Sequence, residues 1–449
     1  METKAYKNSI TEGVIWKQLL AFFFPLLFGT FFQQLYNTVD AVVVGQYVGK
    51  EALAAVGGAA ATIINIFVGF FVGISAGATV TISQFFGGGR FREVKESIHT
   101  AIAFSLVAGL VIMVVGFLLA PRALAIMDTP ADTMEGSVLY LRIYFCGMIA
   151  NLLYNMGAGI LRAMGDSKRP LYFLIVSCIV NVALDILLVV AFKMGVAGVA
   201  LATIMSQIVS ALFVWVALAK LPGEYRLQVK DVHIHGWVFK RIIAIGLPAG
   251  FQSLMYSLSN ALIQVSVNSF GTDTVAAWTA YSKIDALFWM VVNAFGISIT
   301  TFVGQNYGAG LYKRVRKGVR QCLLITAAFT LFINALIIPF GQILFRLFTT
   351  DGAVMEIGLS MLYFLAPLYM TYICIEIYSG ALRGMGDSFL PMLITCGGIC
   401  GIRVVWLLTV VPKWHNMKTV MMSYPITWVI TSGLFLIYYT WYTKKNNIN

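Results

Sequence analysis

Two distant stretches of the chain are almost identical: LRAMGDSKRP at residues 161–170 and LRGMGDSFLP at residues 382–391. Seven of the ten positions carry the same residue. Each stretch holds a Gly-Asp-Ser turn between two apolar runs, which is typical of a short loop joining two helices. So dense a match between distant segments indicates that the chain contains an internal duplication.

The similarity continues on both sides of these turns. The matched pairs, which keep a similar spacing with small gaps, are Pro25 with Pro248, Asn37 with Asn260, GIS from residue 73 with GIS from residue 296, and QFFGGGRF from residue 84 with QNYGAGLY from residue 305. The duplication therefore covers the whole chain. It predicts an N-lobe at residues 1–219, a charged linker at 220–241 and a C-lobe at 242–449.

The composition places this duplicated fold in a membrane. Of 449 residues, 59% are hydrophobic and only 11% are charged, whereas soluble proteins carry about 25% charged residues. This excludes a soluble enzyme. No stretch resembles GxxxxGK[ST], so the chain has no ATP-binding motor of its own. We expect a device that is powered by an existing gradient, and not an enzyme.

Apolar runs long enough to cross a bilayer recur along the chain, each needing about 20 residues. They predict twelve spans, at residues 16–45, 52–84, 98–120, 138–161, 170–192, 198–219, 242–269, 275–303, 321–344, 357–382, 389–411 and 419–442. Each half contributes six spans, and because six is even both halves enter the membrane from the same side. The predicted fold is all-α, with two six-helix bundles related by a parallel pseudo-two-fold repeat.

The net charge of +12 is explained by orientation. With the N-terminus inside, 22 of the 31 Lys and Arg residues fall in inner segments and 6 in outer loops, as the positive-inside rule requires. We therefore expect a multi-pass protein of the plasma (inner) membrane with both termini cytoplasmic. Its partners are then the lipid bilayer and a small molecule, and not a nucleic acid.

The first half carries two carboxylates inside predicted spans. Asp40 follows Gln33 and Asn37 on one helix face, and Asp185 follows Asn181 by one turn. With Thr203, they lie at similar depth in the outer half of the membrane. Such hard oxygen ligands suit Na⁺, or a proton if one carboxyl is neutral. Two plainer interpretations are that Asp40 is solvated near the surface, or that these groups only hold helices together.

The duplication favours a functional role for these acids. The positions that match Asp40, Asn181 and Asp185 in the second half hold apolar or aromatic side chains, namely Ile263, Ile402 and Trp406. A purely structural role would be expected in both halves. The asymmetry therefore predicts a cation-coupling site confined to the first half.

The second half has its own charges within spans. We expect Asp285 and Arg403 to form a structural ion pair, because they lie at similar depth. Glu376, which lies deeper, either attracts cations in a cavity or joins two helices. The residues expected to line a central substrate cavity are Gln33, Tyr36, Asn37, Asn155, Gln252, Tyr256, Asn260, Gln264 and Glu376.

Two prolines stand at matched positions inside the first span of each half. Pro25 and Pro248 each remove a backbone hydrogen bond and favour a kink. A kinked span that also carries Asp40 is a candidate moving part, so we interpret both prolines as hinges. The alternative is a static bend.

The chain resembles the multidrug and toxic compound extrusion (MATE) family along essentially its whole length. The residues that carry the resemblance are the two repeated turns, NVALD at 181–185, GVAGVALAT at 195–203 and VGQNYGAG at 303–310. The resemblance implies two six-helix lobes around a V-shaped cavity that opens alternately to each side. It also implies export of amphipathic, often cationic compounds in exchange for H⁺ or Na⁺, with no other cofactor.

The resemblance further implies that Asp40, Asn181, Asp185 and Thr203, with Tyr140, form the family's N-lobe cation site, where Na⁺ would bind if it is the coupling ion. Members of the NorM-like branch have a glutamate in span seven, which this chain lacks, so it looks more like the DinF-like and MepA-like branches. We expect a monomer. The rival function is a flippase for lipids or polyprenyl-linked glycans of the same superfamily.

Overall fold

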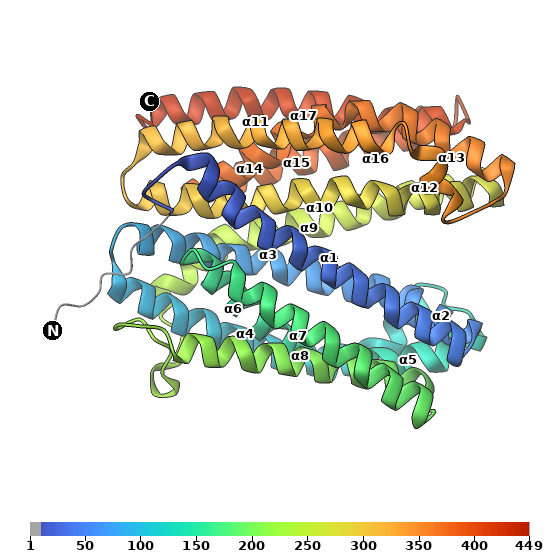
Figure 1. The fold of residues 1–449 in the computed structure, drawn as a ribbon, viewed down its shortest axis with the longest axis horizontal. Helices are drawn as coiled ribbons and strands as arrows, with labels where there is room; N and C mark the ends of the chain where they lie inside the picture. Colours follow the sequence, from blue (N-terminus) through green and yellow to red (C-terminus); the bar gives the residue numbers. More distant parts are fainter. Residues whose placement is uncertain (1–9, 449) are drawn as a thin grey trace. The chain divides into compact units, whose positions relative to one another are not determined.

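The computed structural model describes residues 10–448, and every regular element in that range is a helix (Figure 1). Eleven helical segments there are long and apolar enough to cross a membrane. A twelfth is the pair α5 (Ala131–Cys146) and α6 (Met148–Ala163), which is bent by 51° at its break. The predicted all-α membrane fold with twelve spans is thus confirmed.

The chain divides into two compact units. Within the described range, the first unit is Phe24–Gly250, and the second unit is residues 10–23 together with 251–448. This division differs from the lobe boundaries at 219 and 242, because it follows packing and not hydropathy. The three predicted segments remain a sequence-based division of the chain.

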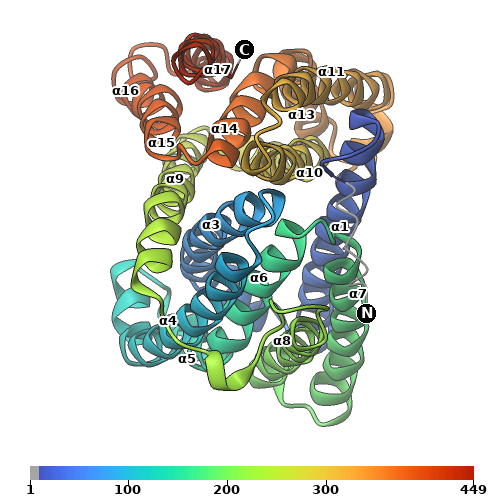
Figure 2. The same ribbon diagram turned by 90° about the vertical axis from the view of Figure 1, so that its left-hand side faces the viewer.

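The first unit is built around α6. Besides α5 and α6, its helices are α2 (Lys50–Gly57), α3 (Ala59–Gly87), α4 (Phe91–Ile126), α7 (Lys168–Asp185), the π-helical turn η1 (Ile186–Ala191), α8 (Gly195–Ala219) and the short 3₁₀ turn η2 (Val229–Asp231). Helix α6 packs against α3, α4 and α8 (Figure 2). Ile98, Ile160 and Val214, one from each of α4, α6 and α8, are fully buried in this core. Burying such apolar side chains stabilises the bundle through close packing, since lipid offers no hydrophobic driving force between helices.

The second unit is built around α10. Its helices are α10 (Thr272–Gly308), α11 (Tyr312–Ile337), α12 (Gly341–Arg346), α13 (Gly352–Leu365), the 3₁₀ turn η3 (Ala366–Thr371), α14 (Ile373–Met385), α15 (Phe389–Thr395), the π-helical turn η4 (Cys396–Gly401), α16 (Ile402–Thr409) and α17 (Met417–Lys445). Helix α10 packs against α11, α13 and α14. A run of small and apolar residues makes most of its second half fully buried.

Helices α1 (Ile15–Tyr47) and α9 (Gly236–Asn268) each belong to both units. Helix α1 passes from the second unit to the first between Phe23 and Phe24, and α9 passes from the first to the second after Gly250. These points lie within two residues of Pro25 and Pro248. Both helices continue through their prolines without interruption. Proline is tolerated inside membrane helices because neighbouring helices and local helical adjustments satisfy the freed backbone groups.

Different contacts hold the first part of each of these helices. The Phe23 ring of α1 stacks on Phe295 of α10 at a centroid distance of 3.9 Å. Near the start of α9, the guanidinium of Arg241 donates a hydrogen bond of 2.5 Å to Gln84 Oε1 of α3. Each helix therefore begins in one unit and ends in the other.

The predicted linker 220–241 is helical from Gly236 onward and is bound to α4. The Gln228 amide donates a hydrogen bond of 3.1 Å to His99 Nε2. The His235 amide donates to Thr100 Oγ1 at 3.0 Å, and Lys95 pairs with Asp231 at 2.5 Å. Two backbone amides and the Asp231 carboxylate thus dock the linker onto α4.

Candidate functional site

The two acids of the first unit are buried together. Asp40 lies in α1 and is 8% exposed, whereas Asp185 is the last residue of α7 and is fully buried. The Asp40 carboxyl faces the side chains of Asp185 and Asn181. The structure therefore brings together three of the five residues that sequence reasoning assigned to one site.

These groups are close but lack ordinary hydrogen bonds. Within residues 10–448, no partner is present for Asp40 Oδ1, for either carboxyl oxygen of Asp185, or for either amide atom of Asn181. A buried charge without a partner costs several kcal/mol, and buried polar atoms are nearly always bonded. Two adjacent carboxyls can meet this requirement by sharing a proton or by binding a cation.

A π-helical turn follows Asp185 directly. Residues 186–191 form η1 and widen the helix immediately after the acid. Such turns are rare and frequently occur at functional sites. The backbone geometry next to Asp185 thus also indicates a functional position, in agreement with its charge in the sequence.

Thr203 and Tyr140, the other two residues assigned to the site, are both buried. Thr203 is buried in α8, and its hydroxyl donates to Val199 O at 3.0 Å, which leaves its oxygen lone pairs as acceptors. Tyr140 lies close enough to Asp40 and Asp185 for their charges to act on it. Tyr36, expected in the cavity, also lies close to Asp40.

The other predicted cavity residues of the first unit are spread out. Gln33 and Asn37 are exposed on α1. Asn155 is tied to its own helix, because its side-chain amide donates to the backbone oxygen of Asn151 at 2.9 Å and to its Oδ1 at 3.1 Å. Only Tyr36 among these four lies beside the acids.

The polar stripe of α9 makes side-chain contacts within the second unit. Gln252 donates to Thr395 Oγ1 at 3.2 Å, and the Tyr256 hydroxyl lies 3.3 Å from the Tyr372 hydroxyl. Further along, Gln264 donates to Asn268 at 2.9 Å, whereas Asn260 is exposed. The stripe therefore combines contacts inside the unit with accessible polar groups.

Glu376 lies at a close crossing of α14 and α10. Its carboxylate occupies the space where Gly296 has no side chain, since a Cβ there would collide with Oε1. Tyr372 donates to Oε2 at 3.3 Å. Glu376 is half-buried, so this carboxylate has one long hydrogen bond and remains accessible.

The predicted ion pair between Asp285 and Arg403 is wrong. Asp285 accepts hydrogen bonds from the Trp289 indole at 2.6 Å, from the Tyr281 hydroxyl at 3.4 Å and from the Tyr369 hydroxyl. Arg403 instead stacks over the Tyr424 ring at 4.3 Å. Neutral donors satisfy the carboxylate because they reach it from its own helix and from η3.

Sequence reasoning missed these three donors. Tyr281 and Trp289 stand four residues before and after Asp285, so they lie on its helix face, and this spacing could have identified them. Tyr369 lies on η3, far away in the sequence, and no sequence signal pointed to it. It reaches Asp285 only through the packing of the second unit.

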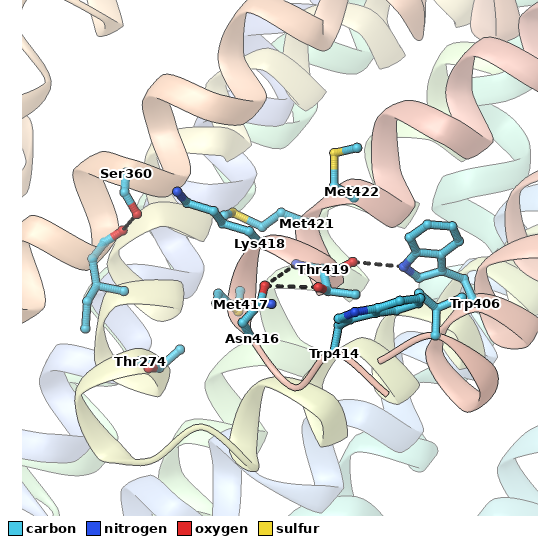
Figure 3. Close-up of a pocket in the computed structure, with 12 residues that line it drawn as sticks. Thr274, Ser360, Trp406, Trp414, Asn416, Met417, Lys418, Thr419, Met421 and Met422 are labelled. Carbon is cyan, nitrogen blue, oxygen red and sulfur yellow. Dashed lines mark hydrogen bonds between the residues drawn. The ribbon is translucent and has the colours of Figure 1, made fainter. Parts of the chain in front are cut away.

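A separate cavity of about 680 Å³ opens in the second unit (Figure 3). Its walls include Trp406 and Trp414, Met421 and Met422, and the Lys418 side chain. The Trp406 indole donates to Thr419 O at 2.8 Å, which fixes the ring at the start of α17. None of the predicted site residues lies in this cavity.

No cluster of three or more His, Cys, Asp or Glu side chains suited to a metal ion occurs in the part of the chain described, residues 10–448. The paired acids and their neighbouring oxygens thus differ from a transition-metal centre. Hard oxygen ligands favour an alkali cation or a proton over a soft metal.

Together, the apolar helices, the duplicated organisation and the paired buried acids define a multi-pass membrane transporter. The MatE family model matches residues 25–187 and 248–408, one match in each half. The chain belongs to this family of multidrug transporters, whose members are not enzymes.

Named relatives agree with this assignment. "Probable multidrug resistance protein YoeA" of Bacillus subtilis is 27% identical over 97% of this chain and 95% of its own length. "Multidrug export protein MepA" of Staphylococcus aureus is 22% identical over 88% of this chain and 85% of its own. The crystal structure of "MATE in the bent conformation" has a TM-score of 0.91 at 20% identity, covering 99% of this chain and all of that one. The likeness to MepA is consistent with the predicted branch.

Proposed function

We propose that this transporter exports amphipathic organic cations in exchange for H⁺ or Na⁺ and that the exchange depends on Asp40 and Asp185. The observation that carries the proposal is the pair of buried carboxyls without ordinary hydrogen-bond partners. Two such groups favour binding of a proton or a small cation, which removes the cost of unpaired charge. Helical membrane proteins keep such acids chiefly where they serve ion or proton pathways.

The ligand set fits either coupling ion. Asp40, Asp185 and Asn181 offer carboxylate and amide oxygens, and Thr203 adds a hydroxyl whose lone pairs can accept. A sodium ion would be held by these oxygens, and a proton would be held by one carboxyl. Tyr140 of α5 lies near both acids. In both cases the bound ion neutralises charge beside α1.

The cycle follows from the linkage between ion and conformation. In the outward-open state the acids load the ion, their neutralisation rearranges α1 about Pro25, and the organic substrate is released outside. Ion release on the inside then resets the transporter. An ion drives these steps only if it binds the two states with different affinity. Pro248 would provide the equivalent hinge in α9.

The topology completes the proposal. We place both termini and the docked linker in the cytoplasm, because they belong to the inner segments that together hold 22 of the 31 Lys and Arg residues. The protein then resides in the plasma membrane as a monomer. The predicted cavity residues on α1, α6 and α9, together with Glu376, would contact the substrate.

Transport in proteoliposomes tests this function. We expect ethidium efflux by the wild-type protein when a pH gradient or a sodium gradient is imposed separately, and the effective gradient identifies the ion. Asp40→Asn and Asp185→Asn should each lower the coupled rate at least tenfold. Asp132→Asn, which changes an exposed acid of the same unit, is the control. Full-rate ethidium efflux by correctly inserted Asp40→Asn and Asp185→Asn variants would refute the proposal.

A further inference from the structure

We propose that Arg403 recognises a carboxylate on amphipathic molecules that the transporter carries, so that its substrates include zwitterions as well as simple cations. This inference rests on the proposed export function and adds a specificity residue in the second unit. The starting observation is that the Arg403 guanidinium is buried, while its predicted partner Asp285 accepts hydrogen bonds from other residues.

Arg403 is only 2% exposed. Across residues 10–448 it makes no ion pair, and its Nε has no hydrogen-bond partner. Its one strong contact is the stack over Tyr424. A cation–π contact contributes about 0.5–2 kcal/mol, whereas burying an unpaired charge costs several. A bound anion would remove this imbalance.

The acids of the second unit do not supply that anion. Asp285 acts on the same Tyr424 ring as Arg403, but its carboxylate is engaged by three donors. Glu376 faces Tyr372, and the cation that acts on it is Arg383. The guanidinium therefore keeps donors available for an incoming carboxylate, which its planar fork can bind in a bidentate manner.

The surroundings of Arg403 suit an amphipathic ligand. Tyr256 and Tyr424, the aromatic side chains next to the guanidinium, are both half-buried. Because both rings are partly accessible, they can stack on an organic body. The Tyr424 hydroxyl is a further donor for a carboxylate.

The nearby cavity has the same electrostatic sign. Its wall includes Trp406 and Met421. Trp406 follows Arg403 by three residues, and Met421 precedes Tyr424 by three residues, about one helical turn in each case. Lys418 is the charged side chain among the described residues that line it (Figure 3). An apolar wall that includes Lys418 and lies about one helical turn from Arg403 fits an amphipath that bears a negative group.

The duplication places Arg403 in the counterpart of the helix that holds Asp185. In the first unit, Asp185 immediately precedes the π-helical turn η1; in the second unit, Arg403 follows the π-helical turn η4 by two residues. The two turns do not occupy matched positions, but each of these helices carries a buried charge within two residues of a π-helical turn, negative in the first unit and positive in the second.

A matched pair of dyes tests this assignment. Rhodamine 110 carries a free carboxylate, and rhodamine 123 is its methyl ester, so the two dyes differ in that one charge. We expect Arg403→Gln to lower the ratio of rhodamine 110 to rhodamine 123 transport at least tenfold in proteoliposomes. Arg403→Lys should lower the ratio less, because it keeps the charge and loses the bidentate geometry. Lys220→Gln, on the linker, is the control.

Two results would overturn the assignment. One is an unchanged ratio in Arg403→Gln. The other is an equal loss of transport of both dyes in Arg403→Gln that the additional change Asp285→Asn restores. Arg403 would then only balance the charge of Asp285. If the wild-type protein transports neither dye, the proposed export fails independently. Fluorescence anisotropy of rhodamine 110 with the detergent-solubilised protein then decides: tenfold weaker binding by Arg403→Gln supports the assignment, and equal binding rejects it.

Discussion

Gly77 of α3 and Gly246 of α9 pack backbone against backbone. A Cβ on Gly77 would lie 2.6 Å from the Gly246 nitrogen and would also collide with the Ile242 carbonyl. One turn away, Gly73 meets Gly250 in the same manner. Both helices thus present a Gly-x-x-x-Gly face, the pattern that lets membrane helices approach closely. These two contacts, one on each side of Pro248, fix the first part of α9 to the first unit.

Gly77→Ala should destabilise the protein, because a methyl group at this crossing forces the two backbones apart. Overpacking of this kind costs about 1–3 kcal/mol. The thermal unfolding midpoint of the detergent-solubilised protein measures the effect. Gly433→Ala in α17 is the matched control, because nothing lies within 4 Å of a Cβ there. Equal midpoints for the two variants would contradict the close-packing argument.

Pro25→Ala and Pro248→Ala should slow transport while leaving substrate affinity within about twofold. Each proline stands within two residues of the point where its helix passes between units, and alanine restores a hydrogen bond that stiffens the helix. The ethidium efflux rate and ethidium binding should be measured together. Pro425→Ala, inside α17 of the second unit, is the control. A hinge role is excluded if the Pro25 and Pro248 variants match that control in rate.

Tyr369→Phe should lower stability by about 1–2 kcal/mol. It removes a hydrogen bond to the half-buried carboxylate of Asp285, and such bonds in membrane proteins contribute up to about this amount. Chemical denaturation in mixed micelles provides the measurement. Tyr363→Phe removes a hydroxyl from an exposed ring and should have no effect. A Tyr369→Phe variant as stable as Tyr363→Phe would show that the other two donors suffice.

Docking of the linker should weaken as the pH falls below about 6.5, the ordinary value for histidine. Burial, followed by the nearby His233, lowers the pKa of His235, while Glu96 opposes this shift. The docked linker therefore binds fewer protons than the free linker. Its docking is fully stable above the ordinary pKa and is progressively lost as the pH falls towards the lowered one.

Hydrogen exchange measures this pH dependence directly. After correction for intrinsic rates, the Gln228 and His235 amides should lose protection between pH 7 and pH 5.5. His235→Asn keeps an acceptor near Thr100 but does not titrate, so the pH dependence of its protection should be smaller. If both proteins lose protection equally, His235 does not control docking.

Hydropathy and repetition by themselves determined the architecture. The twelve spans followed from apolar length, because a bilayer requires about 20 such residues whatever their neighbours are. Asp40, Asn181 and Asp185 could be grouped because helical period and depth are properties of a sequence. The difference between the two halves supported this grouping, because the matching positions of the second half carry no acids.

Only the tertiary structure decided how side chains from different helices pair. Depth alone suggested that Asp285 binds Arg403, but packing gave the carboxylate to Tyr369 and left the guanidinium on Tyr424. Packing also assigned the two ends of α1 and of α9 to different units. Depth and hydropathy are one-dimensional quantities, whereas the rotation and neighbours of each helix depend on contacts between residues that are distant in the chain.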